Sequence, residues 1–122
     1  MLFFAGFVYA KLPTYEEYAA ESVTVKKNHV LVLEGKYYSI RTILRNAAKR
    51  PVNFAGHYIL YTYGCGGGCL DGGVIDATSG RVVSDFPSTY DTSDEGDEQF
   101  DINYHSNSKL LIIKGKKLAL LV

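Results

Sequence analysis

The chain has no excess of charge of either sign, because 13 basic residues balance 13 acidic residues among 122. Balanced charge produces no field over the whole molecule that would attract nucleic acid or an anionic membrane. No apolar run is long enough to cross a bilayer, which takes about 20 residues. The glycines lack both the Gly-Lys-Ser/Thr ending and the strand-to-helix pattern of phosphate-binding loops, so neither kind of nucleotide site is predicted.

Tryptophan is absent, whereas tyrosine occurs ten times in a chain rich in valine, isoleucine and leucine. Such residues favour β-strands. Hydrophobic residues make up 47% of the chain and charged residues 21%, which is the balance of a globular protein. We therefore predict one β-rich globular domain over residues 11–122, since this length is typical of a single domain.

The first ten residues are almost wholly apolar and end in Val8-Tyr9-Ala10, with a small residue at the position where a signal peptidase would cut. Cleavage there would make Lys11 the first residue of the mature protein. A complete signal also has a positively charged leader, and no basic residue precedes Lys11. Residues 1–10 are interpreted either as the remnant of a secretory signal or as a first strand. We expect a periplasmic or secreted protein, with a cytoplasmic one as the alternative.

Two helices are predicted in the first half. Thr14 and Glu17 have the spacing of a capping box, which predicts a short helix over Tyr15–Ser22. The segment Ile40–Lys49 carries its apolar residues in a single stripe, as a helix covering one face of a sheet does. Between these helices, the valines and leucines predict a strand at His29–Leu33.

The second half is rich in strand-forming residues separated by turn signals. Strands are expected at residues 57–63, 73–77, 81–86, 100–104, 109–114 and 118–122. Residues 88–99 are polar and acidic and are expected to form a long loop. The predicted fold class is α+β, with an antiparallel meander of about six strands covered on one face by one main helix, plus a short N-terminal helix.

The segment from Cys65 to Cys69 contains two cysteines four residues apart with three glycines between them. Glycine reaches backbone angles that allow so small a ring to close, so a local disulfide is the favoured interpretation. A metal site, a redox dithiol, and a catalytic cysteine assisted by His57 with Asp71 or Asp76 are the alternatives. No cofactor is expected.

The charges are distributed unevenly, with a basic first half and an acidic stretch later in the chain. The simplest interpretation is two solvated faces, and the alternative is a site that reads the charge of a partner. The acidic candidates for partner binding are Asp91, Asp94, Glu95, Asp97 and Glu98. Tyr61 and Tyr63 would share one face of a strand, where exposed tyrosines could add to an interface or lie half-buried under a second layer.

The run Asn53-Phe54-Ala55-Gly56-His57-Tyr58, followed by Gly64-Cys65-Gly66 and Cys69, resembles a group of small exported bacterial proteins. The group has no established activity, so the resemblance implies no catalytic residue. It implies a periplasmic or secreted setting and one disulfide.

These features predict a non-enzymatic binding protein of the bacterial envelope, for example one that neutralises a toxin or inhibits a hydrolase. The expected partner is another protein, steered by the acidic stretch, and not nucleic acid. A thiol-dependent enzyme, either a Cys/His hydrolase or a redox protein, is the first alternative. The second is a structural envelope component that forms homo-oligomers through an edge strand at Leu118–Val122.

Overall fold

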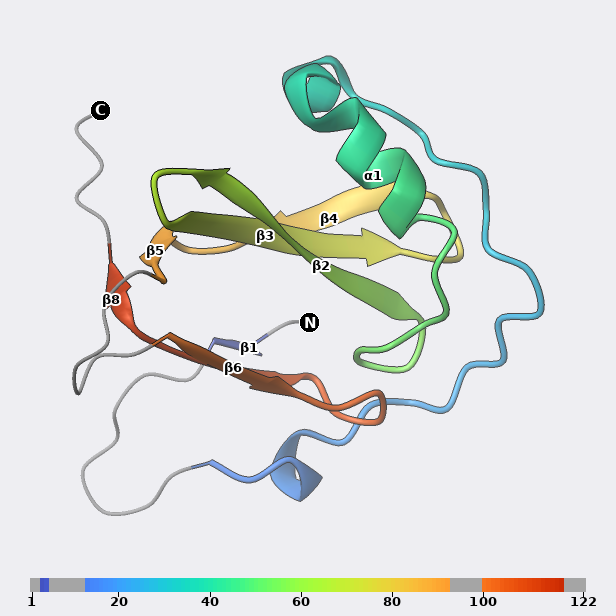
Figure 1. Cartoon of the computed structure of the whole chain (residues 1–122). Coiled ribbons are helices and arrows are strands. Elements are labelled where there is room, and N and C mark those ends of the chain that lie inside the picture. Colours follow the sequence, from blue (N-terminus) through green and yellow to red (C-terminus); the bar gives the residue numbers. More distant parts are fainter. Residues whose placement is uncertain (1–2, 5–12, 93–99, 118–122) are drawn as a thin grey trace.

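The computed structural model describes residues 3–4, 13–92 and 100–117. Two β-sheets pack against each other, and helix α1 (Arg41–Ala47) covers the outer face of the larger sheet (Figure 1). The α+β class is therefore as predicted. The single meander is wrong, because the strands divide between two sheets.

The larger sheet is built around a long hairpin of β2 (Tyr58–Gly66) and β3 (Cys69–Asp76). The other edge of β3 is shared by two strands, with β4 (Arg81–Asp85) along one part and β5 (Tyr90–Asp91) along the other. Strand β8 (Lys116–Lys117) then pairs with β5. All these pairings are antiparallel, and the hairpin between β3 and β4 was predicted from its turn.

The smaller sheet has the order β1-β7-β6. Strands β6 (Asp101–Tyr104) and β7 (Leu110–Lys114) form the predicted antiparallel hairpin. Strand β1 (Phe3–Phe4) lies parallel to β7, with Phe3 opposite Leu110. Residues 5–12 and the predicted strand at 118–122 lie outside the described residues.

The core lies on both faces of β2, because strand residues alternate in direction. Ile59 and Tyr61 face α1, where they pack with Leu44. Leu60 faces the smaller sheet, where Leu111 belongs to the same buried cluster. The larger sheet is consequently the middle of three layers.

The first predicted helix is shorter than expected. A single 3₁₀ turn, η1 (Glu16–Tyr18), replaces the helix over Tyr15–Ser22. The capping box is present, since the amide of Glu17 donates to Thr14 Oγ1 and the amide of Thr14 donates to Glu17 Oε1. The helix stops there because Ala19 forms a β-bridge with Ser108, which holds the chain extended.

The predicted strand at His29–Leu33 is also wrong. The chain from Glu21 to Glu34, called here segment 21–34, belongs to no sheet and bends at Lys26 and Lys27. It is fastened to the β3–β4 turn by two backbone hydrogen bonds, His29 N to Ala77 O at 2.8 Å and Val32 N to Gly80 O at 2.8 Å. Two bonds fix its position without making a ladder.

The main helix also differs from its predicted range. It is preceded by a 3₁₀ helix, η2 (Gly35–Ile40), and its α-helical part covers only Arg41–Ala47. The predicted loop at 88–99 contains strand β5, whose Tyr90 is buried. Aromatic packing of Tyr90 with Phe86 and Phe100 fixes this part of the chain despite its polar composition.

Candidate functional site

The cysteines lie in the turn between β2 and β3. The sulfur atoms of Cys65 and Cys69 are at disulfide distance, and their Cα atoms are 5.0 Å apart. Gly66, Gly67 and Gly68 all have positive φ angles, which the tight ring requires. In the chain-entropy model so small a ring contributes about 2 kcal/mol, so the main effect of the bond is to hold the turn.

The catalytic candidates His57 and Asp76 lie at the opposite end of this hairpin. Tyr58 pairs with Asp76, whereas Gly66 pairs with Cys69. Strand β2 spans nine residues, which at about 3.3 Å per residue places its two ends roughly 25 Å apart. The structure therefore does not bring His57 together with either cysteine.

His57 and Asp76 do contact each other, with 2.9 Å between His57 Nδ1 and Asp76 Oδ1. The same oxygen accepts hydrogen bonds from the amide and hydroxyl of Thr78, at 2.9 and 2.6 Å. Burial would raise the pKa of Asp76, but these hydrogen bonds from Thr78 and His57 outweigh it and lower the pKa. The contacts of Asp76 with His57 and Thr78 stabilise the turn between β3 and β4.

The structure separates the predicted partner-binding residues. Tyr61 is 2% exposed and lies under α1, so it contributes no surface to a protein interface. Tyr63 is half-buried and donates to Asp71 Oδ2 at 3.3 Å. Asp91 is half-buried in β5, opposite Lys116. Asp94, Glu95, Asp97 and Glu98 lie outside the described residues.

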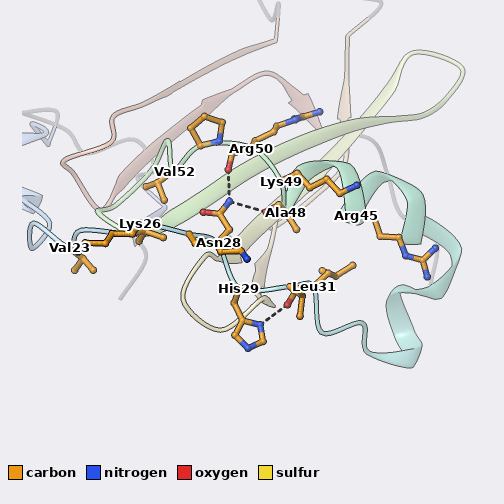
Figure 2. A pocket seen from close by; sticks show the side chains of 14 residues that line it. Val23, Lys26, Asn28, His29, Leu31, Arg45, Ala48, Lys49, Arg50 and Val52 are labelled. Carbon is orange, nitrogen blue, oxygen red and sulfur yellow. Dashed lines mark hydrogen bonds between the residues drawn. The ribbon is translucent and has the colours of Figure 1, made fainter.

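A groove of about 650 Å³ lies elsewhere, between segment 21–34 and the chain that leaves α1. Asn28 crosses between its two walls, with its side-chain amide donating to Ala48 O at 2.9 Å and to Arg50 O at 2.7 Å (Figure 2). These two hydrogen bonds hold segment 21–34 against the chain that follows α1.

Aliphatic side chains and basic side chains line this groove together. The aliphatic ones are Val23, Val25, Val30, Leu31, Ala48 and Val52. The basic ones are Lys26, Lys27, Arg45, Lys49 and Arg50. None of the described residues that line the groove is acidic. Lys26 and Lys49 lie on opposite sides of Asn28 (Figure 2), so positive charge flanks an apolar floor.

The sequence shows that the first half of the chain is basic. It does not show whether these basic residues form a binding site for a partner or only a solvated face. Lys26 and Lys49 lie on different elements, and only the packing of segment 21–34 beside α1 brings them to one groove. Charge count could find these residues, but their convergence depends on the tertiary fold.

Within residues 3–4, 13–92 and 100–117, no group of three or more His, Cys, Asp or Glu side chains is arranged to hold a metal ion. No helix of this described part is long and apolar enough to cross a membrane. Comparison with protein-family models, curated proteins and solved structures gives no match.

Proposed function

We propose that the chain is a non-enzymatic binding protein of the bacterial envelope whose groove holds an extended, acidic segment of another protein. The observation that carries the proposal is the lining of the groove, which combines five cationic side chains with an apolar floor and, among the described residues, no carboxylate. Such a lining attracts an anionic partner and buries its apolar side chains. It replaces the acidic stretch as the surface expected to steer the partner.

An extended partner is favoured by the backbone of segment 21–34. Within the described part of the chain, no backbone group between Glu21 and Asn28 forms a backbone hydrogen bond. Extended backbone with free donors and acceptors can pair with an added strand, while alternate side chains of that strand enter the groove. A partner segment that alternates acidic and apolar residues satisfies both requirements.

Blocking a toxin or a hydrolase is a natural consequence of holding such a segment, if the segment borders the active site of the partner. The thiol-enzyme alternative is less well supported, because the disulfide engages both cysteines and His57 lies at the far end of the hairpin. The alternative of self-association through residues 118–122 concerns a part of the chain outside the described residues.

The groove can be tested with a fluorescent synthetic peptide in which glutamate and leucine alternate. Reversal of two groove charges, Lys26→Glu with Lys49→Glu, is expected to weaken binding by about tenfold or more, because close charge pairs contribute about 1.5 kcal/mol or more. Both lysines are exposed, so the fold should be retained. Fluorescence anisotropy at low salt measures the affinity.

The matched control is Lys36→Glu with Lys114→Glu, which changes the net charge equally at exposed positions outside the groove. This control should bind the peptide nearly as well as the unchanged protein. Equal weakening in both double variants would mean that only the overall charge matters, and the groove would then have no binding role.

Export is a separate part of the proposal. The intact mass of the protein purified from its own cell, with and without reduction and alkylation, is expected to show a closed Cys65–Cys69 disulfide and a chain that begins at Lys11. Cleavage there would remove β1 and leave β6 and β7 as the smaller sheet. Oxidising compartments allow such a bond to persist, whereas the cytosol keeps thiols reduced. A mass that begins at Met1 with two alkylated thiols would contradict export.

A further inference from the structure

A second cavity, of about 300 Å³, lies on the α1 side of the larger sheet, between η2 and the chain that follows β4. Three tyrosines and two carboxylates dominate its lining, together with two hydroxyl side chains after β4. These residues are Tyr37, Tyr61, Tyr63, Asp71, Asp85, Ser88 and Thr89. The cavity is called here the tyrosine pocket, and it is distinct from the basic groove.

The register of three strands produces the tyrosine pocket. Tyr61 of β2 lies opposite Gly73 of β3, which lies opposite Asp85 of β4. Gly73 contributes no side chain, and a Cβ atom there would be 2.7 Å from the hydroxyl of Tyr61. The missing side chain at Gly73 leaves room for the end of the Tyr61 ring, which lies over this glycine.

The next row adds Tyr63 opposite Asp71, which is on the same face of β3 as Gly73. Tyr63 donates to Asp71 at 3.3 Å, and Tyr37 of η2 donates to the two oxygens of Asp85 at 3.0 and 3.1 Å. Each carboxylate accepts a tyrosine hydrogen bond and keeps further lone pairs available.

The two carboxylates have no cationic partner in the described part of the chain. Lys36 also lines the cavity, but its ammonium lies 5.1 Å from the centre of the Tyr37 ring. The negative charges of half-buried Asp71 and exposed Asp85 are therefore not neutralised by an ion pair within the described residues.

Two hydroxyl groups in the same cavity lack partners among the described residues. Thr89 Oγ1 is buried and forms no hydrogen bond. The side chain of Tyr61 is 2% exposed and lines the same cavity, where its hydroxyl forms no hydrogen bond with the described residues. Buried polar atoms are normally satisfied, so the buried Thr89 hydroxyl indicates a bound group that completes it.

We propose that the tyrosine pocket binds the primary ammonium group of a small organic amine. An ammonium has three donors, which match the free lone pairs of Asp71 and Asp85 and one of the unpaired hydroxyl oxygens. Aromatic rings beside these carboxylates add attraction for a cation. The volume admits a small molecule and is at the lower end for ligand pockets.

The hydroxyls of Tyr37 and Tyr63 lie beside the two carboxylates of the pocket. Burial, together with the hydrogen bond and charge of Asp85, raises the pKa of Tyr37 to about 12. Burial and Asp71 likewise raise the pKa of Tyr63 to about 12. The charges of Asp71 and Asp85, which contribute to these shifts after burial, favour a cation beside them.

The test compares butylamine with butanol, which has the same shape but no charge, by isothermal titration calorimetry. Butylamine is expected to bind more tightly than butanol. Asp85→Asn should weaken butylamine binding by about tenfold or more, as the loss of a charge-assisted hydrogen bond predicts. Asp101→Asn, an exposed position in the other sheet, should leave the affinity unchanged.

Asp71→Asn should weaken butylamine binding as Asp85→Asn does, which tests the role of the second carboxylate. Circular dichroism checks that both variants fold. Equal binding of butanol and butylamine would overturn the assignment of a cation. Binding of glucose without binding of butylamine would assign the pocket to polyhydroxyl ligands instead. Binding of none of the three would leave ordered water as the occupant and would also overturn the proposal.

Discussion

Leu44→Ala is expected to lower the free energy of unfolding by about 2–5 kcal/mol. Leu44 is a fully buried residue of α1. Its side chain packs against Ile59 and Ile75 of the larger sheet. Truncation removes apolar contact and leaves a cavity that the rigid sheet below cannot fill. A loss of this size is a large fraction of the about 5–15 kcal/mol that stabilises a typical domain.

The helix depends on this contact because it is only seven residues long. Isolated helices shorter than about 12 residues are marginal in water, so α1 is held by packing and not by its own propensity. Loss of Leu44 therefore loosens the whole element. The residues from Ala48 to Val52, which come directly after α1 and line one side of the groove, should become more mobile as well.

Urea unfolding followed by circular dichroism measures this effect. Thr42→Ala, on the same helix but exposed, is the matched control and should change the stability by no more than about 0.5 kcal/mol. Similar midpoints for Leu44→Ala and Thr42→Ala would show that α1 is not anchored on the sheet in solution.

Local signals in the sequence predicted the hairpins well. The turn around Gly80 and the turn after Tyr104 each join strands that are adjacent in the chain, so their pairing depends on nearby residues. The division into two sheets depends on distant pairings, such as Phe3 with Leu110. No periodicity within either segment indicates such a partner.

Segment 21–34 shows how the tertiary structure overrides propensity. Its valines and leucines are strand formers, yet the edge of β3 is already occupied by β4 and β5. The segment therefore lies across the β3–β4 turn and forms only the two bonds from His29 and Val32. Composition favours a strand, whereas pairing into a sheet depends on where the tertiary structure positions the segment.

The site residues show the same limit. Alternation correctly placed Tyr61 and Tyr63 on one face, but only the packing of α1 shows that this face is the covered one. The pairing of Tyr63 with Asp71 and of Tyr37 with Asp85 depends on strand register and on the position of η2. Neither can be read from spacing in the sequence.

Gly80→Ala is the second change with a large expected effect, a loss of about 2–5 kcal/mol in the free energy of unfolding. Gly80 has a φ angle of +75°, which residues with a side chain adopt at a cost. A Cβ atom at this position would also collide with the carbonyl oxygen of Val30 and approach His29 Nδ1 at 2.9 Å. Strain and collision therefore add.

Gly35→Ala is the control, because a Cβ atom there meets nothing within 4 Å. Its expected effect lies between no change and a gain of up to about 1 kcal/mol, since alanine reduces the freedom of the unfolded chain. Equal stability of Gly80→Ala and Gly35→Ala would show that segment 21–34 does not pack against the β3–β4 turn in solution.

A double variant separates the two collisions. His29→Ala removes the contact with the imidazole, but the carbonyl of Val30 belongs to the backbone and cannot be trimmed. The double variant His29→Ala with Gly80→Ala should therefore remain destabilised. Because Gly80 O also accepts the hydrogen bond from Val32, displacement of the segment moves the wall of the basic groove. Gly80→Ala should consequently weaken binding of the glutamate–leucine peptide although every groove charge is retained.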